Sequence, residues 1–249
     1  MRFFIAVFIL WIINLSAKDF IIAGSANMQY ALEDLSKEYT KESGISFKTV
    51  ISSSGKLTAQ IENGAPFSIF LSADMEYPHK LYTLGSAIAE PKVYAKGILV
   101  LWTKEKWDIK NIPSLLISSR VRTIAIANPE IAPYGKEAIH ALEYYKLSEK
   151  IKSKFIYAES ISQVNQYILS GSADIGFTSK SAVTFKQANG IGHWIELDEK
   201  SYKPIEQGIV IIKYGLDNYP VECKSFYNFL FSEKARSILK KNVYIVDGL

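Results

Sequence analysis

The chain has 249 residues, of which 48% are hydrophobic and 22% are charged, a composition typical of a globular protein and unlike that of a disordered, collagenous or coiled-coil chain. Lys and Arg exceed Asp and Glu by only 29 to 25, and no long basic run concentrates this charge, so a nucleic acid is not expected as a partner. The single cysteine, Cys223, excludes an internal disulfide and a thiolate metal cluster.

The N-terminal residues have the pattern of an export signal. Arg2 is followed by an apolar stretch at 3–13 and then by the small residues Ser16 and Ala17, which is the order found in a secretory signal peptide. The apolar stretch is shorter than the roughly 20 residues that a membrane-spanning helix needs. We therefore predict a signal peptide at 1–17 and a mature protein in the periplasm, with secretion beyond the cell as the alternative.

Short apolar strands alternate with amphipathic helices along the rest of the chain. The first set of predicted strands and helices is 20–24, 28–41, 45–51, 56–63, 67–72 and 77–84. The second set is 97–102, 112–117, 123–127, 134–145, 154–157, 161–169 and 174–178, and the last two elements are a strand at 208–212 and a helix at 221–240. This alternation predicts an α/β fold in which helices flank mostly parallel sheets.

Two sets of strands and helices fit two lobes better than one large sheet. Connections are predicted near 94–97 and 204–208. The predicted division is a first lobe formed by 18–96 together with 208–249, and a second lobe formed by 97–207.

Polar turns lie where predicted strands end and helices begin. In open α/β sheets, ligands bind beyond the carboxyl ends of the strands, where helix N-termini present free N–H groups and a partial positive charge. Five junctions have this character, and four of them place a hydroxyl beside a helix start: 24–27, 52–55, 132–135, 159–161 and 178–180. Serine is also a favoured helix cap, so each junction alone has a simpler explanation. Convergence of several junctions on one cleft would instead favour an anion site built from neutral donors.

Five blocks of sequence at or near the strand ends carry a recognisable pattern. They are Ala23-Gly24-Ser25-Ala26-Asn27-Met28, Ser53-Ser54-Gly55-Lys56-Leu57 with Gln60-Ile61-Glu62-Asn63-Gly64-Ala65-Pro66, Leu71-Ser72-Ala73-Asp74, Asn128-Pro129-Glu130 with Ala132-Pro133-Tyr134-Gly135, and Ala173-Asp174-Ile175-Gly176-Phe177. In this order they resemble the motifs of the periplasmic molybdate-binding proteins of the ModA family. The resemblance implies a type II periplasmic binding protein with two lobes and a two-stranded hinge. Such a protein holds molybdate or tungstate in its cleft and delivers it to the membrane permease of an ABC importer. We accordingly expect a monomer without catalysis, cofactor or bound metal cation.

The resemblance also implies a set of oxyanion-binding residues: Ser25, Ser54, Tyr134, Ile161 and Ser179. Ser25 and Ser54 would donate from their hydroxyls, with Ser53 as an alternative to Ser54. Tyr134 and Ile161 would donate from their backbone N–H groups. Ser179 would replace a tyrosine hydroxyl that some family members place at this junction.

Other functions remain open at this stage. The same fold could bind sulfate or phosphate, or it could serve as an exported sensor or adhesin module. Ser53 and Lys56 also form a Ser-x-x-Lys pair typical of penicillin-recognising serine hydrolases, but the companion Ser-Asp-Asn and Lys-Thr-Gly motifs are missing. Asp74, Glu76 and His79 have a spacing that could bind a metal ion, although a solvated loop is the simpler interpretation.

Overall fold

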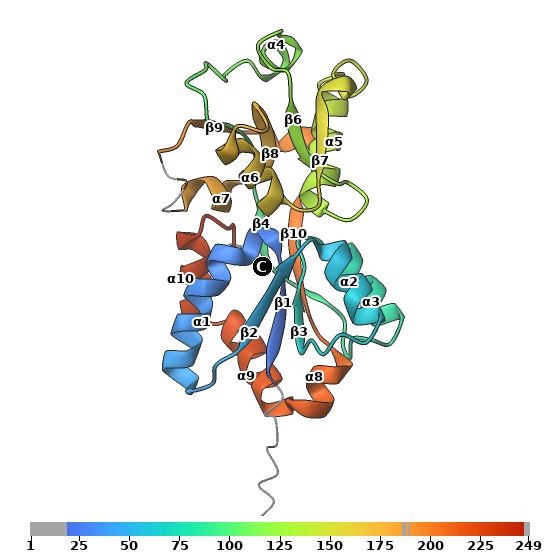
Figure 1. The fold of residues 1–249 in the computed structure, drawn as a ribbon. Coiled ribbons are helices and arrows are strands. Elements are labelled where there is room, and N and C mark those ends of the chain that lie inside the picture. Colours follow the sequence, from blue (N-terminus) through green and yellow to red (C-terminus); the bar gives the residue numbers. More distant parts are fainter. Residues whose placement is uncertain (1–18, 186–187, 189, 247–249) are drawn as a thin grey trace, which may run out of the picture.

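The computed structural model describes residues 19–185, 188 and 190–246, so the predicted signal peptide at 1–17 lies outside the described residues. Two lobes lie one above the other, each built on a five-stranded sheet with helices packed against it (Figure 1). The predicted α/β class is confirmed. Within the described residues, no helix combines the length and the apolar character needed to cross a bilayer.

Lobe I, the lower lobe in Figure 1, is built on a sheet with the strand order β2-β1-β3-β10-β4. Its strands are β1 (Ile21–Ser25), β2 (Lys48–Ser52), β3 (Ile69–Leu71), β4 (Lys92–Gly97) and β10 (Ile205–Ile211). Its helices are the 3-10 helix η1 (Ala26–Met28), α1 (Gln29–Ser43), α2 (Ser54–Glu62), α3 (Glu76–Thr83), α8 (Lys213–Asn218), α9 (Pro220–Leu230) and α10 (Glu233–Lys241).

Lobe II repeats this arrangement with the strand order β7-β6-β8-β5-β9. Its strands are β5 (Leu99–Thr103), β6 (Ile124–Ala127), β7 (Phe155–Ala158), β8 (Ile175–Ser179) and β9 (His193–Glu196). Its helices are α4 (Ile112–Ile117), α5 (Pro133–Tyr144), α6 (Ile161–Ser170), α7 (Lys180–Thr184) and the 3-10 helices η2 (Lys152–Lys154) and η3 (Glu199–Ser201).

Most strands in each sheet run in the same direction. In lobe I, β1 pairs in parallel with β2 and β3, and β10 is antiparallel to both β3 and β4. In lobe II, β6 pairs in parallel with β7 and β8, and β5 is antiparallel to both β8 and β9. Only β10 and β5 therefore run against the other strands of their sheets. The carboxyl ends of the remaining strands in each lobe face the other lobe (Figure 1).

The chain passes between the two sheets next to a pair of antiparallel strands. Ile205 at the start of β10 pairs with Gly97 at the end of β4, and β5 begins two residues later at Leu99. Lys96 also forms a bridge with Ile245, which brings the C-terminal segment to the same place. The lobe boundaries drawn from the sequence at 96/97 and 207/208 stay a prediction.

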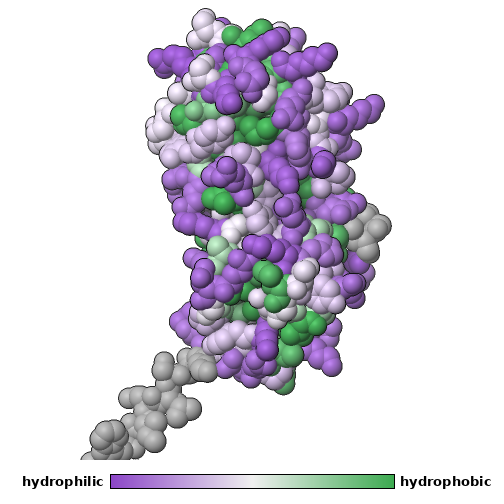
Figure 2. All heavy atoms as spheres, turned by 90° about the vertical axis from the view of Figure 1, so that its right-hand side faces the viewer, coloured by the Kyte–Doolittle hydropathy of each residue, from purple (hydrophilic) through white to green (hydrophobic). Residues whose placement is uncertain are grey.

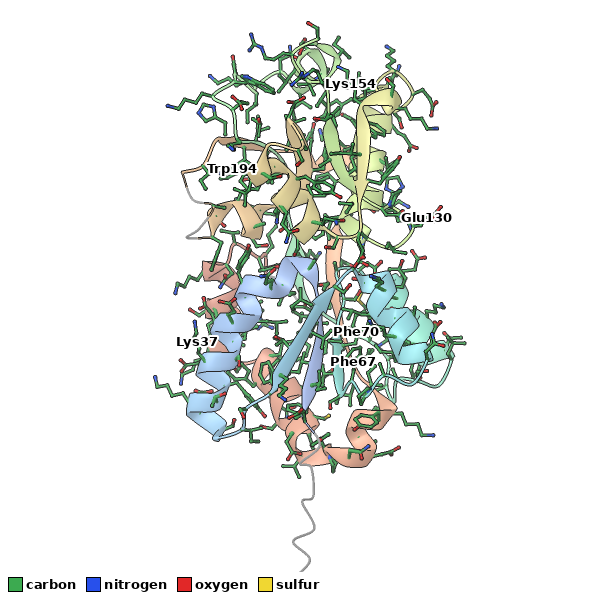
Figure 3. The ribbon with its side chains drawn as sticks, in the orientation of Figure 1. Lys37, Phe67, Phe70, Glu130, Lys154 and Trp194 are labelled. Carbon is green, nitrogen blue, oxygen red and sulfur yellow. The ribbon has the colours of Figure 1, made fainter. Side chains whose placement is uncertain are left out.

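Alternating side chains of the lobe I strands enter two separate apolar clusters. Ile22 and Ile209 pack with α1, α9 and α10 on one face of the sheet. Ala23 and Val210 pack with α2 and α3 on the other face. Phe67 and Phe70, labelled within lobe I in Figure 3, belong to this second cluster. Burial on both faces holds the sheet rigid beneath the strand ends.

In lobe II, β5 lies between β8 and β9, and all five of its residues are buried. The sequence predicted β5, β6, β7 and β8 and missed β9, which is polar and mostly exposed. The sequence also predicted one long C-terminal helix at 221–240, whereas the structure has two helices there, α9 and α10, separated by a short turn. Ser232 produces the break because its hydroxyl accepts a hydrogen bond from the N–H of Ala235 and starts a new helix.

Gly135 allows α5 to lie directly against the end of β6. A Cβ at this position would lie 1.9 Å from the carbonyl oxygen of Ala127, which is backbone and cannot move aside easily. Gly135→Ala should therefore lower the free energy of unfolding by about 1–3 kcal/mol, the usual cost of overpacking a core. Urea unfolding measures this change, and an unaltered midpoint would contradict the close packing of α5 on β6.

Candidate functional site

A small cavity lies between the lobes, where the ends of β1, β2 and β3 meet the ends of β6 and β7. Its lining residues are Ser25, Ala26, Asn27, Ser53, Ser54, Ala73, Ala132, Pro133, Tyr134, Ser160 and Ile161. The space open to the centre of a water-sized sphere is about 10 Å³, which is roughly the room for one such sphere. The cavity therefore suits one small ion and excludes a sugar or a peptide.

The structure brings four of the five predicted ligand residues together. Ser25 and Ser54 line the cavity from lobe I, and Tyr134 and Ile161 line it from lobe II. Ser179 is not among the lining residues, because its hydroxyl lies 2.9 Å from that of Ser181 behind the cavity. The geometry gives Ser179 no direct contact with the cavity.

Three serines at the cavity occupy N-cap positions without acting as caps. Ser25, Ser53 and Ser160 precede η1, α2 and α6, and none of their side chains forms a capping hydrogen bond. Outside the cavity, Ser232 caps α10, and Ser179 at the start of α7 is uncapped because its hydroxyl pairs with that of Ser181. Helix capping therefore does not explain the serines at the cavity, although it was the simpler explanation for each of them.

Ser53 and Ser54 present their hydroxyls differently. The Ser53 hydroxyl is buried and has no hydrogen-bond partner among the described residues. The Ser54 hydroxyl accepts a hydrogen bond from the N–H of Ala73 at 3.0 Å. Since a hydroxyl can accept and donate at the same time, the proton of Ser54 stays available to a ligand.

Two helices of lobe II direct their N-termini at the same cavity. Tyr134 and Ile161 lie in the first turns of α5 and α6, where backbone N–H groups have no partner within the helix. Pro133 at the first position of α5 has no N–H, so Tyr134 carries the first donor of that helix. The partial positive charge of both helix ends favours an anion between them.

The lobes touch beside the cavity through two hydrogen bonds to backbone carbonyl groups of lobe II. The N–H of Gly55 donates to the carbonyl oxygen of Ile131 at 2.9 Å. The hydroxyl of Tyr77 donates to the carbonyl oxygen of Glu130, also at 2.9 Å. Glu130 is labelled at the edge of lobe II nearest to lobe I in Figure 3. These contacts hold the helix ends of the two lobes in register around the cavity.

Two ion pairs of opposite sense join the lobes on the same side. Lys56 of lobe I pairs with Glu159 of lobe II, and Lys136 of lobe II pairs with Glu76 of lobe I, each at 2.6 Å. All four side chains are well exposed, so each pair contributes at most about 1 kcal/mol. Figure 2 shows that hydrophilic residues predominate on the face that carries α2, α3 and α5, including where the lobes meet. The cavity itself, in contrast, has no charged residue in its lining.

The hydrolase interpretation fails on the position of Lys56. Its ammonium group bonds to Glu159, and the Ser53 hydroxyl has no partner, so the two residues do not form a nucleophile and base pair. The metal interpretation has no structural support either. Within the described residues, no group of three or more His, Cys, Asp or Glu side chains could hold a metal ion.

Asp74 instead organises the turn that leads into α3. Its carboxylate accepts hydrogen bonds from the Ser72 hydroxyl at 2.9 Å and from the N–H of Tyr77 at 3.2 Å. Burial nevertheless raises the pKa of Asp74 to about 6, because the loss of water around the charge outweighs these bonds.

Sequence reasoning missed further lining residues, among them Asn27, Ala73 and Ser160. Asn27 and Ala73 lie inside motifs shared with the ModA family, and Ser160 lies in the polar junction at 159–161, so the position of each next to a strand end was a usable signal. Their residue types alone gave no reason to prefer them over their neighbours. Asn27 is buried, and its side chain contacts groups 180 and 217 residues away in the sequence.

Gly55 should control how closely the lobes approach. A Cβ there would lie 2.6 Å from the Tyr77 hydroxyl and 2.9 Å from the Cα of Ile131. Gly55→Ala should therefore part the lobes at this edge and increase the radius of gyration in small-angle X-ray scattering. Gly44→Ala is the control, since Gly44 has a positive φ but no atom within 4 Å of the added Cβ, and it should leave the scattering unchanged. Equal profiles for all three proteins would contradict the assigned role of Gly55.

Asp74 should make stability depend on pH. Its pKa rises from 3.8 to about 6 on folding, so the folded protein holds a proton that the unfolded chain has lost between these values. The contribution of this group to stability is therefore present below about pH 4 and is lost as the pH rises to about 6. Asp74→Asn removes the charge and should reduce the fall in unfolding free energy between pH 4 and 7. Denaturant unfolding at both pH values measures it, and an equal fall in both proteins would contradict the burial of the charge.

Comparisons with known proteins agree with this architecture. The family model described as bacterial extracellular solute-binding protein matches residues 20–244. The molybdate-binding protein ModA of Azotobacter vinelandii is 33% identical over 92% of this chain and 90% of its own length. ModA of Rhodobacter capsulatus is 31% identical over 93% of this chain and 90% of its own.

A solved structure gives the same result. The periplasmic molybdate-binding protein of Azotobacter vinelandii superposes with a TM-score of 0.86 at 31% sequence identity, covering 91% of this chain and 99% of that one. The resemblance to the ModA family found in the sequence motifs is therefore confirmed. The chain belongs to the bacterial extracellular solute-binding proteins, and its relatives at 31% and 33% identity are ModA proteins.

Proposed function

We propose that this protein captures a tetrahedral oxyanion, molybdate or tungstate, in the cavity between its lobes and delivers it in the periplasm to the membrane permease of an ABC importer. The observation that carries the proposal is the set of uncapped N-cap serines, Ser25, Ser53 and Ser160, around one cavity. The names of its ModA relatives support the choice of molybdate.

Neutral donors supply the binding chemistry. The lining has no Lys, Arg or His, and its one titratable residue is Tyr134, whose pKa burial raises well above the ordinary value. Hydroxyl and N–H groups bind an anion through charge-assisted hydrogen bonds without a full opposing charge. The ligand is then held firmly and can still leave when the lobes open. Binding should also vary little near neutral pH.

Capture follows from the division of the site between the lobes. Lobe I supplies Ser25 and Ser54, and lobe II supplies the N–H groups of Tyr134 and Ile161. An anion that enters the open cleft binds one half of its donors, and closure about the connecting strands β4 and β10 adds the other half. Contacts such as Gly55 to Ile131 then complete a surface that exists only in the closed protein and that a permease can recognise.

The cavity lining should also discriminate between oxyanions that carry a proton and those that do not. No carboxylate lines the cavity, so a ligand that carries its own proton finds no charged acceptor there. Molybdate, tungstate and sulfate are fully ionised at neutral pH, whereas phosphate retains a proton. Phosphate is therefore the least suitable of these tetrahedral anions.

Calorimetric titration with the four anions tests the proposal. We expect molybdate and tungstate to bind with similar affinity and phosphate to bind far more weakly. If sulfate binds most tightly, the proposed cargo is wrong, whereas the proposed binding site stands. No binding of any of the four would contradict the proposed function.

Ser54→Ala and Ser25→Ala should each weaken molybdate binding, because each removes a hydroxyl donor from the lobe I half of the site. A hydrogen bond to a charged group is worth about 1.5–3 kcal/mol, so Ser54→Ala should raise the Kd roughly 10- to 150-fold. Ser232→Ala is the matched control, since it removes a hydroxyl that does cap a helix and should lower stability without affecting affinity. If Ser54→Ala and Ser25→Ala keep native affinity, neither serine is a ligand.

A further inference from the structure

Behind the cavity, Asn27 lies at the centre of a buried polar network. Its side chain contacts Ser25, Gln207 and Tyr244, at distances of 2.7, 2.7 and 2.9 Å. All four residues are at most 4% exposed. Neither Gln207 nor Tyr244 lines the cavity, whereas Ser25 and Asn27 do.

The donors and acceptors of this network fix the orientation of the Asn27 amide. Tyr244 has one proton, which it donates to the backbone oxygen of Asn27 at 2.7 Å, so toward the side chain it accepts from Nδ2. Gln207 donates its own amide to the carbonyl of Ile205, so its oxygen Oε1 faces Asn27 and also accepts from Nδ2. Both partners require Nδ2 on their side, and Oδ1 of Asn27 therefore faces Ser25.

The Ser25 hydroxyl must then be the donor to Asn27. A serine has one proton, so Ser25 cannot donate to Oδ1 of Asn27 and to an anion at the same time. Ser54 is under no such constraint, because its hydroxyl accepts from the N–H of Ala73 and keeps its proton free.

We propose that Asn27 is a positioning residue that competes with the anion for the proton of Ser25, an inference that rests on the proposed function. In the empty site Ser25 donates to Asn27. When the anion arrives, the hydroxyl turns about its Cα–Cβ bond and donates to the anion, which is the stronger acceptor because it is charged. Binding thus exchanges one neutral hydrogen bond for one charge-assisted bond, and the net contribution of Ser25 is smaller than that of Ser54.

The position of Asn27 links this exchange to the connection between the lobes. Gln207 belongs to β10, and the backbone bridge between Lys96 and Ile245 holds Tyr244 beside β4. From lobe II, the hydroxyl of Ser181 donates to the backbone oxygen of Asn27 at 3.2 Å and lies 3.4 Å from the Tyr244 hydroxyl. Ser179, bonded to Ser181, is the outer member of this network. Asn27 therefore contacts the site, a connecting strand and the opposite lobe at once.

A double-mutant cycle measured by calorimetry with molybdate tests the competition. The Kd ratio, the factor by which Ser25→Ala raises the Kd, is measured twice, once in the native protein and once in the Asn27→Ala variant. In the Asn27→Ala variant, Ser25 has no hydrogen bond to Asn27 to lose when it donates to the anion. Removal of the Ser25 hydroxyl should therefore weaken binding more in this variant than in the native protein, by a further factor of about 2 to 10. An equal or smaller ratio in the Asn27→Ala background overturns the proposal.

Two further variants keep the test decisive. Ser54→Ala is the control, and its Kd ratio should be the same in both backgrounds because its proton is not committed to Asn27. Asn27→Leu serves if Asn27→Ala fails to fold. It removes the competing acceptor while filling a similar volume, and it should likewise increase the Ser25→Ala ratio.

The failure of this inference differs from a failure of the proposed function. If the native protein binds molybdate and Ser25→Ala leaves the affinity unchanged in every background, the competition is overturned and the proposed function stands. If the native protein binds none of the oxyanions, the proposed function fails and the competition fails with it.

Discussion

The site depends on the unpaired N–H groups at the start of each helix. In a parallel strand–helix unit, the strand delivers the chain to the edge of the sheet and the next helix begins there. Because β1, β2, β6 and β7 all end at the boundary between the lobes, the starts of four helices meet at one place. A serine side chain normally pairs such donors. Here the side chains of Ser25, Ser53 and Ser160 do not cap their helices. The N–H of Gly55 bonds to lobe II instead, and the N–H groups at the other helix starts are left to bind a ligand.

Close approach of the lobes makes these donors effective. The absence of a side chain at Gly55 allows α2 to touch the backbone at Ile131, and the cavity that remains between the helix ends has room for about one water-sized sphere. An anion that fills this space displaces the water from it, so each hydrogen bond to the charged ligand is stronger than it would be at the surface. The ion pairs outside the cavity add little strength, and their charges are already matched to one another.

Local patterns in the sequence predicted the sheet strands that end at the site, and the resemblance to the ModA family implied four of the residues that line it. Serine at a strand end is a local signal, and so is the alternation of apolar residues that places Ile22 and Ala23 on opposite faces of a sheet. The role of Asn27 could not be predicted in this way, because Gln207 and Tyr244 reach it only through the crossing of β4 with β10 and the return of the C-terminus. Ser179 has the same local pattern as Ser25, yet the tertiary fold directs it to Ser181 and away from the cavity. The exposed strand β9 was missed because its burial signal is weak, since only one of its residues is even partly buried.

The central claim is that these converging helix starts hold a tetrahedral dianion. The most direct measurement is the anomalous diffraction of crystals grown with tungstate, because tungsten scatters strongly and its position can be found without reference to the protein. The account predicts one dominant tungsten peak between Ser25 and Ser54 of lobe I and the N–H groups of Tyr134 and Ile161 of lobe II. A dominant peak elsewhere on the protein, or an empty cavity in crystals grown with saturating tungstate, would contradict it.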